Sequence, residues 1–429
     1  MVTESAAILK RFYFLERELI HLAAGWVPGT AHWESKLLLP EILWESSILA
    51  RELRQRVLEL RFPERRIALE SGEAPLFGFV RRWGHAPNAV AFVVVLGDVI
   101  KPFMLDLYQR YASRADQLDD GPSQFILRHG MADLEGQIAR LRTTATAALA
   151  AFPAEAKVAR EWSAAVAQSL QRWPHDDFFS TVPAPPGPPT HFTALEKPLA
   201  IARAAARDPR FHRVAFAWPD RHSPGNAGDG MQLRARQAVH HVNEVWAAEM
   251  AAACLHDLGP AAPPEFLEDA ARWCYDEIRH CRMGYERLKA WGFRDAEIPL
   301  DSFSYDAGAG VDAITRLGII FYFEATYIHT KKERTTKFAA MGDRLSSHDM
   351  DFDWADELIH TAYGKRWLGE FLRQSGDERT LSQVKDAARA AVLQKLAAAD
   401  EDDKQASAAI FQRMLDKLTA PGSTTAAAS

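Results

Sequence analysis

Cysteine is scarce in this sequence. The chain of 429 residues has three, Cys254, Cys274 and Cys281. They form no CxxC pair and no even set, which argues against a disulfide framework, a zinc ribbon or a cysteine-ligated cluster. A free cysteine usually behaves as a small apolar residue. We therefore expect three buried free thiols and no built-in cysteine redox module.

Long apolar runs and basic tracts are also missing. The most apolar stretch, "NAVAFVVVLGDVI", is shorter than the roughly 18 residues expected of a transmembrane helix. The net charge is −6, and no dense Lys/Arg tract with interleaved aromatic residues is available to follow a phosphate backbone. The first residues, "MVTESAAILKRFYFLEREL", lack the apolar core of a signal peptide. These features predict a cytoplasmic protein that binds neither membrane nor nucleic acid.

Alternating β-branched runs do not stand out either, whereas apolar residues recur at spacings of three and four along most of the chain. This periodicity predicts an all-α protein. The prolines of "STVPAPPGPPTHFTALEKPLA" prevent helix continuation and mark a boundary. The predicted domains are an N-terminal helical bundle (1–175), a Pro/Gly-rich linker (176–230), a second helical domain (231–375), C-terminal helices (376–420) and a disordered tail (421–429).

Four helical segments make up the predicted second domain, and their connections are short, long and short. This is the pattern of a four-helix bundle with one long crossover. The expected segments are about 231–257, 264–291, 310–341 and 348–373, followed by two further helices at about 378–399 and 402–419.

One motif occurs twice in these segments. "WCYDEIRHCRMGYERL" contains Asp276, Glu277 and His280, and "WADELIHTAYGKRWL" contains Asp356, Glu357 and His360 with the same spacing. Random placement gives roughly one Glu-x-x-His in such a chain but only roughly 0.07 Asp-Glu-x-x-His, so two copies are a strong signal.

The repeat extends to two further glutamates, Glu244 and Glu324, each 33 residues before the glutamate of a motif. All corresponding positions are offset by 80 residues, which indicates duplication of a helical hairpin. Two iron-class ions need several carboxylates and one imidazole each, and a Glu plus a Glu-x-x-His from each hairpin supply this set. The predicted metal ligands are Glu244, Glu277, His280, Glu324, Glu357 and His360. Residues 231–375 are therefore the predicted dinuclear metal domain, and residues 1–175, without a matched pair of such motifs, are expected to be metal-free.

Asp276 and Asp356 lie four residues before the motif histidines. We expect each to accept a hydrogen bond from a ligand imidazole, more plausibly that of the opposite hairpin. Two other residues, Glu249 and His329, also correspond under the 80-residue offset. A regular helix turns a side chain five residues on by about 140°, which favours a structural role for both, whereas a π-bulge would make them extra ligands or a proton relay.

A third Glu-x-x-His, Glu18 and His21, has no carboxylate-rich partner helix at a matching distance. We expect these two residues on the surface or between domains.

The order Glu, DExxH, Glu, DExxH resembles the ferritin-like carboxylate-bridged diiron superfamily, which implies that the six residues are metal ligands. "DEIRH" is similar to the bacterial multicomponent monooxygenases. "HHVNEVWAAEM", "DEIRHCRMGYERLKAWG", "FEATYIHTKKE" and "DELIHTAYGKRWL" together resemble an uncharacterised ferritin-like family that carries only a domain-of-unknown-function label, over about residues 236–371. The sequence departs from that family at His329, where an acidic residue is usual.

The resemblance predicts an oxidoreductase in which two iron ions activate dioxygen to oxidise a small organic substrate. Manganese or a mixed Fe/Mn pair would accept the same ligands. Because the chain has no cysteine-rich module and no GxGxxG fingerprint, electrons would come from an external ferredoxin or flavin reductase. A homodimer is compatible with the sequence. The alternatives are a ferroxidase or peroxide-scavenging protein, a catalytically silent scaffold, and hydroxylation of an RNA nucleotide, which the acidic balance disfavours.

Overall fold

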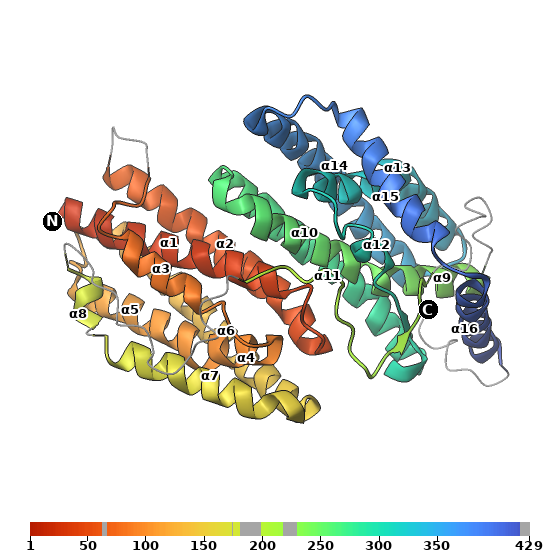
Figure 1. Ribbon diagram of the computed structural model, residues 1–429, viewed down its shortest axis with the longest axis horizontal. Coiled ribbons are helices and arrows are strands. Elements are labelled where there is room, and N and C mark those ends of the chain that lie inside the picture. The colour runs from red at the N-terminus through yellow and green to blue at the C-terminus, as the bar shows by residue number, and fades with distance from the viewer. Residues whose placement is uncertain (62–66, 174, 181–198, 218–229, 421–429) are drawn as a thin grey trace. The chain divides into compact units, whose positions relative to one another are not determined.

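The computed structural model describes residues 1–61, 67–173, 175–180, 199–217 and 230–420. It confirms the all-α class: the described chain is almost entirely helical, and its described strands are two parallel pairs of residues, β1 (His212–Arg213) and β2 (Pro299–Leu300). Figure 1 shows the order of the elements. No helix in the described ranges is long and apolar enough to cross a bilayer. The predicted tail and most of the predicted linker lie outside the described residues.

The chain divides into two compact units, residues 1–201 and 202–429. Unit 1 has an apolar core to which its first helix contributes residues from nearly every face. A five-residue π-helical segment, Leu96–Ile100, interrupts one of its long helices. The helices of unit 1 are α1 (Val2–Trp26), α2 (Trp33–Leu60), α3 (Ala74–Arg82), α4 (Ala89–Val95), α5 (Lys101–Arg114), α6 (Gly121–Ala151), α7 (Pro153–Gln171) and α8 (His175–Phe178).

Of the two places expected for Glu18 and His21, the surface is wrong, because both side chains are buried. The Glu18 carboxylate accepts two hydrogen bonds from the Arg81 guanidinium, each 2.8 Å long. The error arises because α1 is enclosed on almost all sides, so its polar residues find partners inside the unit.

Unit 2 contains four long helical elements that contact one another around a shared interior. The first element, α9 and α10, packs on α11, and α13 packs on α14. The two pairs meet through contacts of α10 with α13 and of α11 with α14. The helices are α9 (Gly230–Asn243), α10 (Val245–Leu258), α11 (Pro264–Ala290), α12 (Phe303–Asp306), α13 (Ala313–Ala340), α14 (Arg344–Ser375), α15 (Leu381–Ala397) and α16 (Glu401–Thr419).

N-cap side chains and a C-terminal glycine mark the ends of these helices. The side chain of Asp312 accepts from the Thr315 amide at the start of α13, and that of Asp343 accepts from the Ser346 amide at the start of α14. Such N-caps satisfy amide groups that have no intrahelical partner. Gly376 ends α14 in the left-handed region with φ of 68°, a conformation that glycine adopts without steric penalty.

Two glycines permit close approach between the helices of each pair. A Cβ at Gly284 of α11 would lie 2.3 Å from the Val242 amide nitrogen and 2.4 Å from the Ala238 carbonyl oxygen of α9. A Cβ at Gly364 of α14 would lie 2.6 Å from the Phe321 ring of α13. Both glycines follow a motif histidine by four residues and correspond under the 80-residue offset.

The cysteines are free and buried, as expected. The Cys274 thiol contacts the Ala248 carbonyl and the Cys281 thiol contacts the Val242 carbonyl, each at 3.2 Å. Both thiols therefore help to pack α11 against α9 and α10. Burial raises the pKa of the Cys254 thiol to about 12, which leaves it protonated and unreactive at neutral pH.

Candidate metal centre

Glu244 occupies a break in the first helical element, between the end of α9 and the start of α10. Its amide donates to the His241 carbonyl at 2.9 Å, and its carbonyl accepts from the Ala247 amide at 2.8 Å, so the turn is tighter than an α-helical one. The neighbouring Asn243 side chain donates from Nδ2 to the Pro299 carbonyl at 3.0 Å, and its Oδ1 accepts from the Asp301 backbone amide. The crossover segment thus fixes the turn that carries Glu244.

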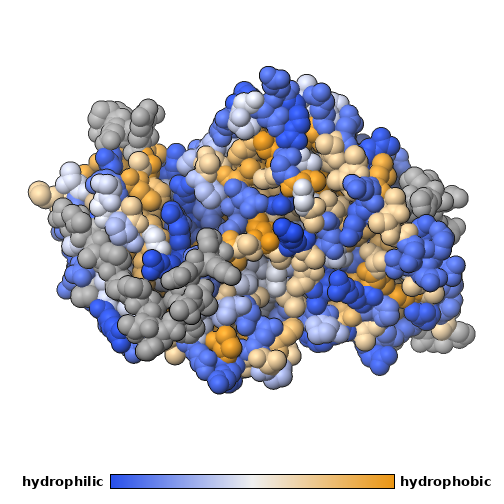
Figure 2. All heavy atoms as spheres, in the orientation of Figure 1, coloured by the Kyte–Doolittle hydropathy of each residue, from blue (hydrophilic) through white to orange (hydrophobic). Residues whose placement is uncertain are grey.

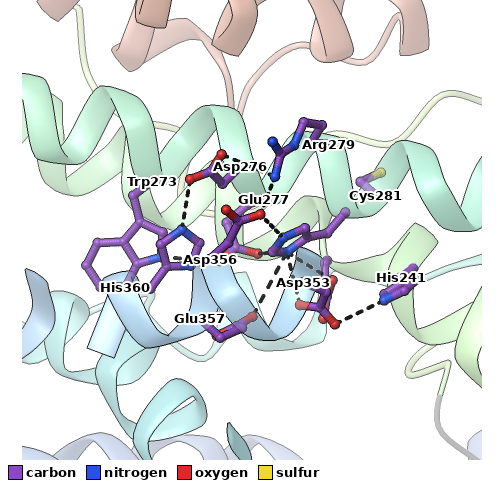
Figure 3. A network of polar contacts seen from close by, with 12 residues as sticks. His241, Trp273, Asp276, Glu277, Arg279, Cys281, Asp353, Asp356, Glu357 and His360 are labelled. Atoms are coloured by element: carbon purple, nitrogen blue, oxygen red, sulfur yellow. Dashed lines mark hydrogen bonds and ion pairs between the residues drawn. The ribbon is translucent and has the colours of Figure 1, made fainter. Parts of the chain in front are cut away.

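All six predicted ligands lie together in the interior of unit 2. Glu277 and His280 come from α11, Glu324 from α13, and Glu357 and His360 from α14. Figure 3 shows the side chains of α11 and α14 pointing toward one another. Because residues three and four apart share a helix face, each DExxH motif directs its Glu and His to the same interior point.

One end of this cluster, called the tryptophan-side position below, consists of Glu277, Glu324, Glu357 and His360. One ligand atom from each lies within 4.8 Å of the others. The Trp273 indole covers this end: its ring stacks on the His360 imidazole at 5.4 Å, and its N–H lies 3.2 Å from Glu277 Oε1 and 3.3 Å from Glu324 Oε1.

The other end, called the lysine-side position below, consists of Glu244, His280 and Asp353, with Glu277 and Glu357 between the two ends. The Lys331 ammonium lies among these carboxylates. It donates to Asp353 Oδ1 and Glu357 Oε1, both at 2.6 Å, and to Glu244 Oε1 at 3.3 Å.

Both imidazoles have one nitrogen held by an aspartate and one directed at the cluster. His280 Nε2 lies 3.1 Å from Asp356 Oδ2, and His360 Nε2 lies 3.4 Å from Asp276 Oδ2. Each aspartate therefore contacts the histidine of the opposite hairpin. Both Nδ1 atoms are buried and have no hydrogen-bond partner among the described residues.

The surroundings of the two Nδ1 atoms consist of carboxylate oxygens. His360 Nδ1 lies 3.1 Å from Glu277 Oε1 and 3.8 Å from Glu324 Oε1, outside hydrogen-bonding geometry. His280 Nδ1 lies 3.6 Å from Glu244 Oε2 and 3.5 Å from Asp353 Oδ1. Glu244 Oε2 and Glu324 Oε2 are also buried without a hydrogen bond in the described chain. Imidazole nitrogens and carboxylate oxygens thus converge on one interior, as the ligands of a cation site do.

Two arginines of α11 neutralise the two aspartates. Arg272 Nε lies 2.6 Å from Asp276 Oδ2, and Arg279 forms an ion pair with Asp356. Arg279 also reaches Asp276 Oδ1 at 3.5 Å. With their charges balanced, the aspartates act as hydrogen-bond acceptors that orient the imidazoles.

Without a cation, the cluster depends on protons. Burial alone would lower the pKa of His360, but the neighbouring Asp276 and Glu277 carboxylates outweigh it and raise this pKa to about 9. Burial, followed by the negative charge of Glu277, raises the pKa of Glu357 well above its ordinary value. Burial would raise the pKa of Glu244, yet the charges of Lys331 and His240 lower it to about 2. An ion at the cluster would replace the extra protons.

Two predicted residues lie away from the cluster. The Glu249 carboxylate is fully buried and paired with the Arg207 guanidinium, at 2.6 Å to Nη1 and 3.0 Å to Nη2. His329 is exposed on α13. Helix α13 is regular through His329, and the tight turn at Glu244 does not swing Glu249 into the cluster.

The structure adds four residues that the motif comparison missed: Trp273, Asp353, Lys331 and His241, whose Nε2 lies 3.2 Å from Asp353 Oδ2. Helical spacing contained a signal for each of them. Trp273 precedes Glu277 and Asp353 precedes Glu357 by four residues each. Lys331 follows Glu324 by seven, and His241 precedes Glu244 by three. These spacings place each side chain on the same helix face as a ligand.

The family described as a protein of unknown function (DUF455) matches residues 125–415, which is more than half of the chain. The chain therefore belongs to the DUF455 family, in agreement with the expected domain-of-unknown-function label. The match begins in unit 1, in α6, and extends into α16. No curated protein and no solved structure matches the chain.

Proposed function

We propose that this DUF455 protein is an oxidoreductase that holds two iron ions in unit 2 and uses dioxygen to oxidise a small organic substrate. The proposal includes a ferritin-like architecture for the four long helical elements. It rests on the residue types of the cluster and on their placement from four helical elements around one interior.

The observation that carries the proposal is the pair of buried imidazoles. Each has Nε2 beside an aspartate and Nδ1 directed at carboxylates without a hydrogen bond. A buried imidazole nitrogen without a hydrogen-bond partner has lost its hydration without gaining a hydrogen bond from the protein. A carboxylate that fixes the tautomer of an imidazole and leaves its other nitrogen free is the usual surrounding of a metal-ligating histidine.

Charge supports the same conclusion. Five buried carboxylates, those of Glu244, Glu277, Glu324, Asp353 and Glu357, face a single ammonium group. Buried carboxylates without compensation are strongly unfavourable. Divalent cations with oxygen and nitrogen ligands would remove this excess of negative charge. The alternative interpretation, in which these helix faces point to water, does not agree with their burial.

Two ferrous ions held by these residues would supply the redox chemistry for oxidation of the substrate by dioxygen. The chain's own residues have separate tasks. Asp276 and Asp356 hold the imidazoles in the ligating tautomer, and Trp273 shields the tryptophan-side position from water. Since the three cysteines are buried and free, electrons for further turnovers would come from an external ferredoxin or flavin reductase.

The test is anaerobic titration of the metal-free protein with ferrous iron, followed by exposure to dioxygen. We expect up to two ions per chain, and oxygen uptake with a transient absorption change. His360→Ala should lose an ion and the oxygen uptake, whereas the matched variant His329→Ala, on the exposed face of α13, should retain both.

Two outcomes would decide against the proposal. A wild-type protein that binds no iron at concentrations well above that of the chain would remove the metal centre. Iron accumulation far beyond two ions per chain would instead favour the ferroxidase alternative.

A further inference from the structure

The Lys331 side chain is an unexpected component of the cluster. It is 6% exposed, and its ammonium contacts Asp353, Glu357 and Glu244. Glu244 and Asp353 are ligand candidates of the lysine-side position, and Glu357 belongs to both positions. The ammonium therefore uses the oxygens that a metal ion at this position would need.

At the tryptophan-side position, Lys331 contacts only Glu357, the glutamate that both positions share. Among the ion pairs of the described ranges, the partners of Glu324 and Glu277 are the two histidines, and no lysine or arginine reaches them. Under the 80-residue offset, Lys331 corresponds to Ala251 and Asp353 corresponds to Trp273. Each half thus differs from the other at the residues that surround the shared ligand set.

We infer that the Lys331 ammonium competes with a metal ion for the lysine-side position, so that the centre loads in order. The first ion binds at the tryptophan-side position, and the second binds only when Lys331 withdraws. This inference rests on the proposed function in one respect, namely that the same carboxylates and histidines bind metal.

Withdrawal is compatible with the chemistry of lysine, whose ammonium is a mobile point charge at the end of a flexible stem. Occupancy by the ammonium lowers the apparent affinity for an ion in proportion to the fraction of molecules that remain open. If about 1–10% of molecules are open, the second ion binds about 10- to 100-fold more weakly than it would without Lys331.

The experiment is an anaerobic titration of the metal-free full-length protein with Mn²⁺, followed by calorimetry and by electron paramagnetic resonance. For the wild type we expect one tight ion with a mononuclear spectrum, and a second ion about 10- to 100-fold weaker that produces a spin-coupled spectrum. Lys331→Met should bring the two affinities together. Lys331→Arg retains the charge and should preserve the gap.

The matched control is Lys332→Met. Lys332 is the adjacent residue, it is exposed, and its ammonium lies 5.5 Å from the Trp354 ring centroid. This variant should titrate like the wild type, which excludes a general effect of losing one positive charge from α13.

The position of the first ion provides a test that needs no variant. Anomalous diffraction from wild-type crystals with one equivalent of Mn²⁺ should give a peak beside Glu324 and His360. A peak beside Glu244 and His280, or two equally tight ions in the wild type, would overturn the inference and leave the proposed function intact. A persistent gap in a folded Lys331→Met protein would also overturn it. A wild type that binds no Mn²⁺ and no Fe²⁺ would overturn both.

Discussion

The two ends of the candidate metal centre have the same kinds of ligand and different surroundings. At the tryptophan-side position, an indole stacks on His360 and donates its N–H to two carboxylates. Among the described residues, the lysine-side position has no indole, and the Asp353 carboxylate and the Lys331 ammonium lie beside its ligand candidates instead. One end is thus covered by an aromatic ring, and the other contains a buried ammonium group. The comparison teaches that a repeated ligand set does not make two equivalent sites, because neighbouring residues decide how readily each accepts an ion.

The largest effect is expected from Glu277→Gln, because the Glu277 carboxylate belongs to both ends of the cluster. Loss of an outer partner of a ligand costs about 10- to 100-fold in metal affinity, so loss of a shared ligand should cost more than about 100-fold at both positions. Titration with Mn²⁺ measures this. Urea unfolding serves as the control for folding, and a folded variant that retains one tight ion would show that Glu277 is not shared.

The two histidines should separate the positions. His360→Ala is expected to lose the tight ion, by about 100-fold or more, whereas His280→Ala should keep it and lose only the weaker one. The two variants are matched because both rings are fully buried and both pair with an aspartate of the opposite hairpin. Equal losses in the two proteins would mean that the ends are equivalent.

Protonation gives a third comparison. The pKa of His360 is raised to about 9 in the metal-free protein, from an ordinary value of 6.5. A raised pKa stabilises the folded state below the unfolded value, so this contribution is complete below pH 6.5 and is lost as the pH rises through about 9. The loss should be about 3 kcal/mol in the free energy of unfolding.

Metal binding should show the opposite trend, since an ion must displace the His360 proton. We expect the affinity for the first ion to rise about tenfold per pH unit between about pH 7 and 9. Chemical unfolding and titration at several pH values measure the two trends. His360→Ala should flatten the stability profile, and a flat profile in the wild type would contradict the assignment.

The smallest effect is expected from Trp273→Phe, which preserves a ring beside His360 and removes the N–H that contacts Glu277 and Glu324. Loss of a hydrogen bond to a charged group should destabilise the protein by about 1.5–3 kcal/mol and weaken the first ion by about tenfold. The control is Trp354→Phe on α14, where the ring lies beside Lys332. A larger change at the second ion than at the first would contradict the division into two positions.

The helical order and the convergence of the six candidate ligands could be predicted because both depend on short spacings. Within each motif the glutamate and the histidine are three residues apart, and corresponding residues of the two halves are 80 residues apart. These spacings can be read from the sequence without knowledge of the tertiary packing. The crossed contacts of Asp276 and Asp356 followed from the expectation that opposite hairpins face each other.

The residues that distinguish the two ends could not be found in the same way. Lys331 and Asp353 have no counterparts of the same type in the other half, so a search for repeats passes over them. Their helix face is readable from the spacing, but the direction of a long lysine side chain depends on which carboxylates surround it. Glu249 illustrates the converse: its partner, Arg207, lies far away in the sequence, before the first helix of unit 2.

Gly284 and Gly364 carry a consequence for how the centre tolerates change. Because α11 meets the backbone of α9 where Gly284 lacks a side chain, main-chain contact rather than side-chain volume sets the separation of these two helices. A side chain at Gly284 would collide with the α9 backbone and force α11 away from it, which would increase the distance between Glu244 and His280. At Gly364 a Cβ would meet the Phe321 ring of α13, so the same substitution there acts against a side chain and should be less disruptive.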